Sequence, residues 1–374
     1  MMPKMNVDVV NVKRLSINLQ PKIKRVISRF FKPGSDQEVS RIIQGVLSYS
    51  DDKSQQLYAA MLEKYRHRHR HFLNKINRYY SEVSHLVPRD AKMTDTKKCL
   101  IGAYCGSEYS IEAAALFNPS IVPHPDQSGL PEGSVRFVLS LRAVGEGHIS
   151  SIVFRSGTID CYGEVTIDPS SPYAHSPAVY EPTDYVKSVF VKYLEMLEIE
   201  QEIVNFVLSD LPDIFTHKQL AQRLAALDGA DFSPTRKRVI KEELLYLERS
   251  KYAFRFNEDT DLSERVIFPG MTSPIYEEIC NGIEDARFIL FTDDDGSQCY
   301  YATYTAYNGR YILPKLLYTK DFVSFKMMPL GGHAVRGKGM ALFPRKVNGN
   351  YVMLSRQDVN NNIMFSDNPK YLEY

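Results

Sequence analysis

The chain has 374 residues, with 46 basic and 45 acidic side chains that leave a formal net charge of +1. The length predicts two or three domains, and a charge balance this close to zero argues against a protein that binds nucleic acid or anionic membranes through bulk charge. The 5 cysteines include no C-x-x-C pair, so neither a disulfide framework nor a zinc knuckle is indicated. No segment approaches the ~20 apolar residues of a membrane span, and we expect a cytoplasmic protein.

Residues 1–98 are predicted to be an N-terminal helical region. A short strand is predicted at Val12–Leu19. Ser35 and Glu38 have the spacing of a capping box, which predicts the start of a helix. A second helical pattern runs over Ser54–Val83.

The segment Arg66–His71 alternates arginine with histidine inside this second pattern. Most such runs form a solvated basic face, and we favour that interpretation because no nearby carboxylate or cysteine completes a set of metal ligands. Two alternatives remain open. His67 and His71 could share a metal from an i,i+4 spacing, or the arginines could contact a phosphate backbone.

Residues 99–178 change from helical to alternating periodicity and are predicted to form the first part of a β domain. Arg136–Leu141 and Ile149–Arg155 have strand patterns, and a turn is predicted to close the second strand at Ser156 and Gly157.

Residues 179–278 are predicted to be a helical insertion. Thr183–Leu211 is amphipathic, Thr216 and Gln219 have capping-box spacing, and Ser233 precedes a proline suited to the first helical position. A small helical bundle inserted into a β domain is the favoured interpretation. The alternative is a DNA-binding helix-turn-helix that uses four cations: Arg236, Lys237, Arg238 and Lys241.

Residues 279–374 return to hairpins and are predicted to be the second part of the β domain, truncated at its C-terminus. Strands are predicted at Arg287–Thr292 and Gln298–Tyr307, and again at Ala341–Val347 and Tyr351–Arg356. Repeated hairpins with aromatic arms are typical of a β-propeller. The fold class is therefore expected to be mainly β with α insertions, as an incomplete propeller of roughly three blades.

Polar side chains cluster near the predicted strand ends at Phe117–Ser120, at Arg142 and at Gly145–Ile152. Sugar hydroxyls need fixed amide, guanidinium and hydroxyl partners, with aromatic rings against the sugar faces. Each segment alone is more simply a turn or a loop. Together they suggest a saccharide site.

A second cluster combines one acidic pair with several cations. Glu284 and Asp285 lie next to Arg287, while Lys338 and Arg356 belong to the last predicted hairpin. One carboxylic acid beside convergent cations suits proton donation next to a bound phosphate. Without that context, Asp285 and Arg287 would more often be a strand-end ion pair.

Taken in order, these motifs resemble glycoside hydrolase family 130, which comprises β-mannoside phosphorylases and related β-mannosidases. The similarity covers about residues 100–160 and 280–374, and the two helical regions resemble additions of a longer branch. The motifs that carry it are Asn118-Pro119, Arg142, Glu284-Asp285-x-Arg287, Tyr304–Gly309, Lys338 with Leu342-Phe343-Pro344, and Ser355-Arg356.

The resemblance implies a five-bladed β-propeller that phosphorolyses β-mannosides, with inversion, to mannose 1-phosphate and a shorter saccharide. It implies that Asp285 is the proton donor, and that Lys338 and Arg356 hold inorganic phosphate, which is a co-substrate. No metal or other cofactor is implied. The substrate contacts that it implies are Asn118, Arg142, Ser151, Arg287 and Tyr307.

Two alternatives stay open within this interpretation. The protein could hydrolyse β-mannosides, with Glu146 or Asp358 as the base that activates water, or it could be an inactive sugar-binding propeller. The expected partners are an oligosaccharide, phosphate and a possible second copy of the chain, without nucleic acid or membrane.

Overall fold

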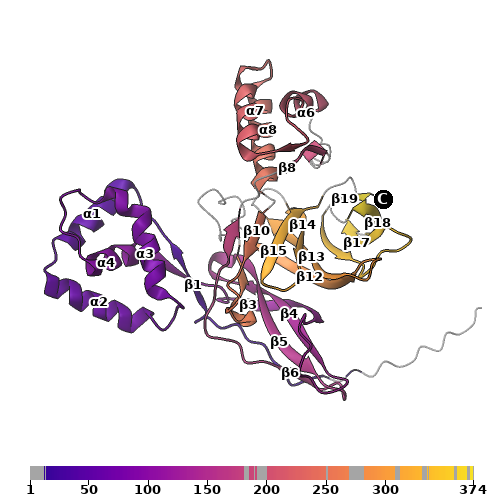
Figure 1. Ribbon diagram of the computed structural model, residues 1–374, viewed down its shortest axis with the longest axis horizontal. Helices are drawn as coiled ribbons and strands as arrows, with labels where there is room; N and C mark the ends of the chain where they lie inside the picture. The colour runs from indigo at the N-terminus through magenta and orange to yellow at the C-terminus, as the bar shows by residue number, and fades with distance from the viewer. Residues whose placement is uncertain are drawn as a thin grey trace, which may run out of the picture.

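The computed structural model describes residues 12, 14–180, 185–188, 190–191, 200–249, 252–268, 282–307, 312–330, 335, 337–357, 360–368 and 371–373. Figure 1 shows a unit of helices at one side, a central body of sheets, and a second group of helices above it. Among the described residues, no helix combines the length and apolar character needed to cross a membrane.

The N-terminal helical unit packs four helices beside a two-stranded ribbon. Its first helix begins as predicted, because the Ser35 hydroxyl accepts the Glu38 N–H and the Glu38 carboxylate accepts the Ser35 N–H. Valine and isoleucine side chains of this helix are buried against the last one. The elements are β1 (Val26–Phe30), α1 (Asp36–Leu47), α2 (Asp51–Tyr65), α3 (Phe72–Val83), η1 (Ser84–Leu86), α4 (Asp95–Tyr104) and β2 (Gly106–Ser110).

Three expectations for this unit were wrong or incomplete. The described residues of 12–19 contain no strand, and the first strand is β1. The pattern over 54–83 is two helices, because the chain turns at Arg66–His71, where His71 has a left-handed φ of 52°. The sequence interpretation also missed α4.

Three larger sheets form the central body. The first sheet has the order β11-β5-β4-β3, with β6 paired to β5, and the second has the order β12-β13-β14-β15-β10-β7. The third sheet has the order β16-β17-β18-β19. The strands of the first sheet are β3 (Ala115–Pro123), β4 (Val135–Val144), β5 (Ser150–Ile159), β6 (Val165–Ile167) and β11 (Val266–Ile267).

The other two sheets follow mainly from the hairpins of the last hundred residues. The strands of the second sheet are β7 (Ala178–Tyr180), β10 (Tyr252–Arg255), β12 (Ile283–Thr292), β13 (Gln298–Tyr307), β14 (Ile312–Thr319) and β15 (Ser324–Pro329). Those of the third sheet are β16 (Lys338–Leu342), β17 (Tyr351–Gln357), β18 (Asn360–Asn368) and β19 (Tyr371–Glu373).

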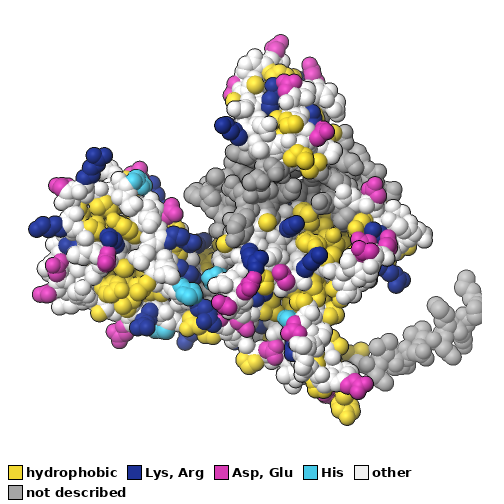
Figure 2. Space-filling view, viewed as in Figure 1, with side chains coloured by type: hydrophobic (Ala, Val, Ile, Leu, Met, Phe, Trp, Pro, Cys, Tyr) yellow, Lys and Arg dark blue, Asp and Glu magenta, His cyan; other side chains and the backbone are white. Residues whose placement is uncertain are grey.

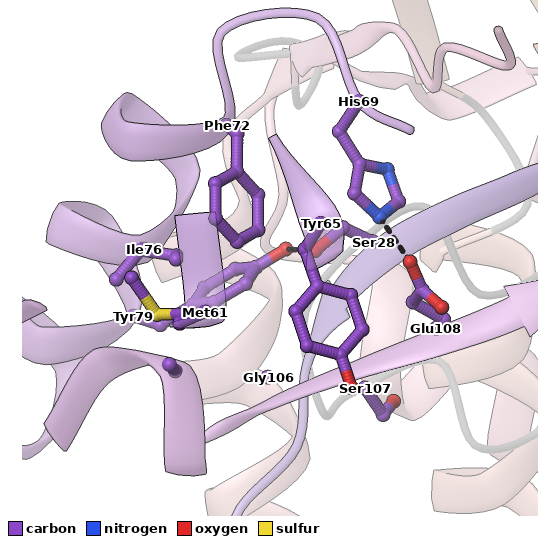
Figure 3. A pocket seen from close by; sticks show the side chains of 11 residues that line it. Ser28, Met61, Tyr65, His69, Phe72, Ile76, Tyr79, Gly106, Ser107 and Glu108 are labelled. Carbon is purple, nitrogen blue, oxygen red and sulfur yellow. Dashed lines mark hydrogen bonds and ion pairs between the residues drawn. The ribbon is translucent and has the colours of Figure 1, made fainter. Parts of the chain in front are cut away.

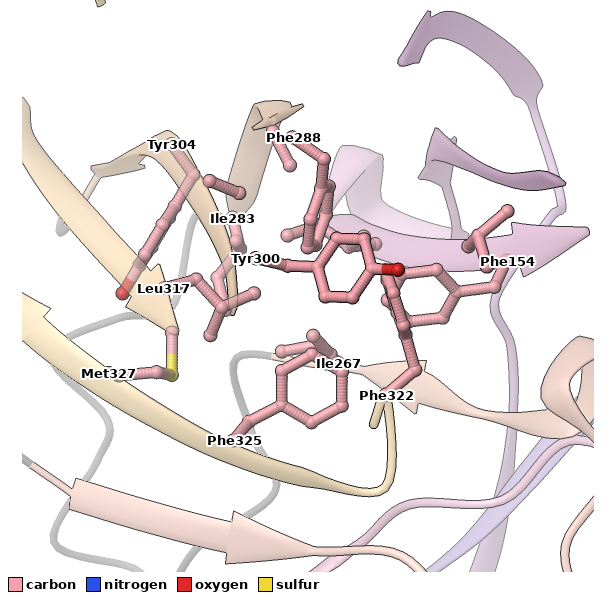
Figure 4. Close-up of a cluster of buried hydrophobic side chains, with 14 of the residues drawn as sticks. Phe154, Ile267, Ile283, Phe288, Tyr300, Tyr304, Leu317, Phe322, Phe325 and Met327 are labelled. Atoms are coloured by element: carbon pink, nitrogen blue, oxygen red, sulfur yellow. The ribbon is translucent and has the colours of Figure 1, made fainter. Parts of the chain in front are cut away.

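Aromatic side chains fill the space between the first and second sheets (Figure 4). Phe154 of the first sheet stands edge-on to Phe288, at a centroid distance of 5.9 Å, and to Phe322, at 5.8 Å. Each such ring stabilises the fold by about 1.5–3 kcal/mol when it is fully buried. A separate cluster, which includes Phe291 and Met353, joins the second sheet to the third. The second sheet is therefore covered on both faces.

The sheets confirm a fold that is mainly β with helical segments, and both predicted strands of residues 99–178 are present. The turn predicted at Ser156 and Gly157 is wrong, because β5 continues to Ile159. A Cβ on Gly157 would lie 2.1 Å from the carbonyl oxygen of Thr166, so this glycine allows β6 to approach. The described residues form no closed propeller ring.

Both hairpins predicted in 279–374 are present. β12 and β13 pair antiparallel as expected, and Asn348 and Gly349 form the turn before β17. The strand predicted at Ala341–Val347 ends earlier, at Leu342, and starts earlier, at Lys338.

A second helical group lies between β7 and β10. It consists of β8 (Tyr185–Val186), α6 (Gln201–Leu208), β9 (Ile214–Phe215), α7 (His217–Ala226), η3 (Leu227–Gly229) and α8 (Pro234–Arg249), and we call it the helical module. It has its own buried cluster, which includes Phe215 and Leu227. The capping box of Thr216 and Gln219 is present, and Pro234 is the first residue of α8, as predicted.

Three of the four α8 cations considered for DNA binding contact groups of the module. Arg236 pairs with Glu200, Lys241 with Asp228 at 2.7 Å, and Lys237 donates to the carbonyl of Asp228 at 2.9 Å. These contacts neutralise or occupy the groups that a helix-turn-helix would need to keep free for phosphates.

Candidate functional site

The edge strands β3, β12 and β16 share one irregularity. In each, two consecutive residues face a single residue of the neighbouring strand, which is a β-bulge. The first bulged residue is Asn118 in β3, Asp285 in β12 and Gly339 in β16, with φ values of 49°, 58° and 83°. Asparagine, aspartate and glycine tolerate this left-handed conformation best. The bulges thus redirect side chains at the edges of all three sheets.

The edge of the second sheet at β12 meets the first sheet, because the residue before β12 contacts the start of β5. Gly282 forms a parallel bridge with Ser150, and a Cβ on this glycine would lie 2.7 Å from the Ser150 nitrogen. Its φ of 124° is also in the region that favours glycine. The close approach brings the start of β12, with Glu284 and Asp285, to Arg142 of β4.

Arg142 joins the two sheets through all three nitrogens of its guanidinium. Nη2 lies 2.5 Å from Glu284, Nη1 lies 3.3 Å from Asp285, and Nε donates to the Ser150 hydroxyl at 2.9 Å. The guanidinium also covers the ring of Phe117, 5.1 Å from its centroid. These contacts fix Arg142 and leave little freedom to the two carboxylates.

Asn118 holds the same oxygen of Asp285, because its Nδ2 donates to Oδ1 at 2.5 Å. The side chain of Asp285 keeps 29% of its surface exposed, so a ligand can reach the carboxylate. The structure therefore brings together Asn118, Arg142 and Asp285, three residues that the sequence placed in one site.

Three cations, which we call the basic group, lie around the bulge of β16: Arg287 of β12, Lys338 of β16 and Arg356 of β17. Lys338 and Arg356 are direct partners in the register of β16 and β17, and both are exposed. A Cβ on Gly339 would lie 3.8 Å from Nη2 of Arg287 and 3.9 Å from Nε of Arg356, so both guanidinium groups border the space over this glycine.

The basic group has no ion-pair partner in the described part of the chain. Like charges that face each other across two strands are unfavourable, whereas an anion between them removes the repulsion. A carboxylic acid can protonate a leaving group, and nearby cations can bind the anion that attacks the substrate. The bulge of β12 and the basic group supply these two parts.

Ser151 does not join this site. It pairs with Ala143 and faces the opposite side of the sheet from Arg142, where its buried hydroxyl has no hydrogen-bond partner. The prediction was off by one residue, because successive side chains of a strand point to opposite faces. Ser150 makes the contact instead. Glu284 was also missed as a partner of Arg142.

Of three other candidates, the structure describes only one in full. Tyr307 ends β13, but its side chain is outside the described part of the chain, as is all of Asp358. Glu146 is exposed in the short helix η2 (Glu146–His148).

The arginine–histidine run is a solvated basic face only in part, because four of its six side chains are exposed and three of the six pair with carboxylates. Basic and histidine side chains gather where the helical unit meets the sheets (Figure 2). Glu108 pairs with Arg68 at 2.9 Å and with His69 at 2.7 Å, while Arg70 pairs with Glu264 at 2.7 Å. The carboxylates lie far away in the sequence, so the local pattern did not reveal them.

The metal interpretation of this run also fails geometrically, because His71 lies in a turn and shares no helix with His67. Across the part of the chain that is described, no three histidine, cysteine or carboxylate side chains gather in a group that could hold a metal ion.

Solved structures with a partial likeness include several carbohydrate-active proteins. They are a glycosyl hydrolase from Bacteroides ovatus (13% identity, TM-score 0.31) and the β-1,2-mannobiose phosphorylase from Listeria innocua (15%, 0.26). A third is a member of the GH130 mannoside phosphorylase family described with hydrolases that target β-1,2-mannosidic linkages in Candida mannan (11%, 0.32). In each case the likeness covers 71% of this chain. It covers 58% of the Listeria phosphorylase and 50% of each of the other two structures.

This chain therefore spans about half the length of these structures. No protein-family model and no curated protein matches the sequence. TM-scores below 0.5 do not place the chain in a family.

Proposed function

We propose that the protein processes glycosides, and that its reaction is the inverting phosphorolysis of β-mannosides at Asp285. The observation that carries the proposal is the basic group, whose members Lys338 and Arg356 face each other without a carboxylate between them. One member of the basic group, Arg287, lies on the same strand as Asp285, the accessible carboxylate that Asn118 and Arg142 hold. Inorganic phosphate has the charge and the oxygens to bridge these cations.

In the proposed reaction, an oxygen of the bound phosphate attacks the anomeric carbon as the glycosidic C–O bond breaks. The proton of Asp285 passes to the leaving oxygen, which gives mannose 1-phosphate and a shortened saccharide. Because phosphate is already a nucleophile, no second carboxylate is needed to activate water. Lys338 and Arg356 hold the phosphate, while Arg142 and Asn118 orient Asp285.

We also propose that β3, β12 and β16 line the central cavity of a β-propeller. Two hydrogen bonds tie neighbouring sheets together near these strands. The Phe288 N–H donates to the Ser120 hydroxyl at 2.9 Å, and the Thr303 hydroxyl donates to the Met340 carbonyl at 2.6 Å. Equivalent bulges on three successive inner strands would present their side chains to one axis.

The test measures sugar phosphate and free sugar released from a panel of mannosides, with and without phosphate. We expect Asp285→Asn to lower turnover by about a hundredfold or more, which is typical for loss of a general acid. Lys338→Ala and Arg356→Ala should raise the phosphate concentration needed for half-maximal rate, whereas exposed Arg41→Ala should not.

Two results would count against the mechanism. Undiminished activity of Asp285→Asn would remove this residue as the acid. Equal turnover without phosphate would indicate a hydrolase instead. Glu146 would then be the candidate for the base that activates water, since Asp358 lies outside the described residues.

A further inference from the structure

A cavity of about 200 Å³ lies where the helical unit meets the ribbon of β1 and β2 (Figure 3). It is separate from the site at Asp285, since its walls come from α2, α3 and α4, the turn before α3, and the two strands of the ribbon. Its lining residues include Met61, Tyr65, Phe72, Ile76 and Tyr79 on the helices. An apolar cavity of ~150 Å³ is enough to hold one benzene molecule.

The helical wall of the cavity is apolar and aromatic. Met61 and Ile76 are buried, and Tyr65 and Phe72 pack against them. The rings of Tyr65 and Phe72 are inclined by only 26°, with centroids 6.3 Å apart. Tyr79 closes one side, and its hydroxyl is already paired with that of Ser28 at 3.0 Å. Such a wall favours a flat apolar ligand.

The opposite wall is polar and carries little net charge. Glu108 lies 2.7 Å from His69 Nε2 and 2.9 Å from Arg68 Nη2, so the arginine balances its charge. Burial, the largest effect on the His69 ring, holds the pKa of this histidine below its usual value, so the imidazole is neutral at pH 7.

Glu108 retains capacity for a further donor. A carboxylate has about four acceptor positions, and these two contacts occupy only two of them. The side chain is 24% exposed and lines the cavity. A ligand with one O–H or N–H group can therefore donate to Glu108 while its ring contacts the helical wall.

We propose that this cavity binds a small neutral aromatic molecule that carries one hydrogen-bond donor, of the size of phenol or indole. The aromatic wall selects the ring, the volume limits its size, and Glu108 selects the donor. A charged ligand is disfavoured because the polar wall is already balanced.

The first test uses phenol and indole as probes on the full chain, with the methyl groups of Met61 and Ile76 observed by NMR. We expect saturable shifts of these signals and no shift of Met353, which lies in the third sheet. Ala103→Leu places three extra carbons in the cavity at little cost in helix propensity, and it should weaken binding by about tenfold or more. Ala60→Leu, at an exposed position of α2, is the matched control and should bind normally.

The second test compares phenol with toluene, which has the same ring and no donor. Wild type should prefer phenol, and Glu108→Gln should reduce this preference roughly fivefold, because a donor binds a charged acceptor more strongly than a neutral one. The proposal is overturned if wild type gives no saturable shift up to the solubility limit of the probes. Equal binding by Ala103→Leu, or equal affinity of wild type for phenol and toluene, would overturn it as well.

Discussion

Asn118 and Asp285 hold a backbone conformation that most residues avoid, and each uses its side chain to contact the other. Strain of this kind persists where the surrounding structure fixes it, and it is common at functional sites. The two residues therefore link the shape of the bulges to the position of the carboxylate.

Substitutions at Asn118 should separate backbone strain from the side-chain contact. Alanine at φ 49° costs roughly 1–2 kcal/mol, whereas glycine adopts this conformation freely. We expect Asn118→Ala to have the lower free energy of unfolding of the two, as measured by urea denaturation. Both variants lose the amide that holds Asp285, so both should lose the proposed activity on glycosides. Equal stability of the two variants would show that the bulge relaxes.

His175 makes the fold sensitive to acid. Burial, and then the nearby charge of Lys75, lower the pKa of His175 from 6.5 to about 4. The unfolded chain thus binds a proton more readily than the folded chain, and stability is lost as pH falls from about 6.5 to about 4. The limit of this loss is about 3 kcal/mol.

Urea denaturation at pH 7 and pH 4.5 tests this prediction. His175→Gln should show a smaller drop in the free energy of unfolding than wild type does. Burial also lowers the pKa values of His69 and His124. These two histidines should therefore still cause part of the acid-induced loss of stability in His175→Gln. An identical drop in both proteins would contradict a role for His175.

The turn between α2 and α3 connects the helical unit to the sheets through charge. The carboxylate of Glu264, in η4 (Leu262–Glu264), is fully buried and accepts three hydrogen bonds from Arg70 Nε and Nη2 and one from Ser171. Burial alone would raise the pKa of Glu264, but the hydrogen bonds from Arg70 and Ser171 outweigh it and hold the pKa below its usual value. A buried carboxylate needs such partners.

Arg70→Gln should therefore destabilise the protein more than its exposed position suggests. We expect a loss of about 2 kcal/mol, because Glu264 stays buried with only Ser171 as a side-chain partner. Arg68→Gln is the matched control. Its pair with Glu108 is partly exposed on both sides and should contribute less than about 1 kcal/mol. Urea denaturation of the three proteins measures both values, and equal losses would contradict the argument.

Elements with local signals could be predicted from the sequence. The capping boxes at Ser35 and Thr216 and the hairpin turn at Asn348 depend on residues a few positions apart, and all three are present. The ion pairs of Arg70 and Glu264 join residues that are 194 positions apart, which no local pattern encodes.

The site was predicted in part for the same reason. Motif order placed Asn118, Arg142 and Asp285 in one region, and their hydrogen bonds show that the three residues are in contact. Ser150 could not be told from Ser151 without the strand register, because one position decides the face.

The described residues leave part of one face of the third sheet uncovered. Leu354 and Ile363, which are register partners, are 44% and 47% exposed, and Phe365 is 41% exposed. The opposite face packs against the second sheet. Adjacent apolar side chains on an exposed sheet face favour association with other surfaces.

Replacing Ile363 by Lys and Phe365 by Thr should reduce self-association, because it removes apolar area from this face. Light scattering at rising protein concentration measures the effect, with unchanged circular dichroism as the check on folding. Tyr162→Lys is the control, because this tyrosine is 87% exposed in the Asp160–Gly163 turn, away from the third sheet. If the double variant associates as wild type does, this face is not responsible.

The helical module begins and ends within one pair of strands. Tyr180 of β7 faces Ala253 of β10, so the chain leaves the second sheet and returns to it at neighbouring positions. Residues paired across antiparallel strands have Cα atoms only ~4.5–5.5 Å apart. A two-residue turn can span this distance. In evolutionary terms, the module occupies the place of a hairpin loop, where a lineage can gain, lose or exchange a folded unit while the order of strands in the sheet stays the same.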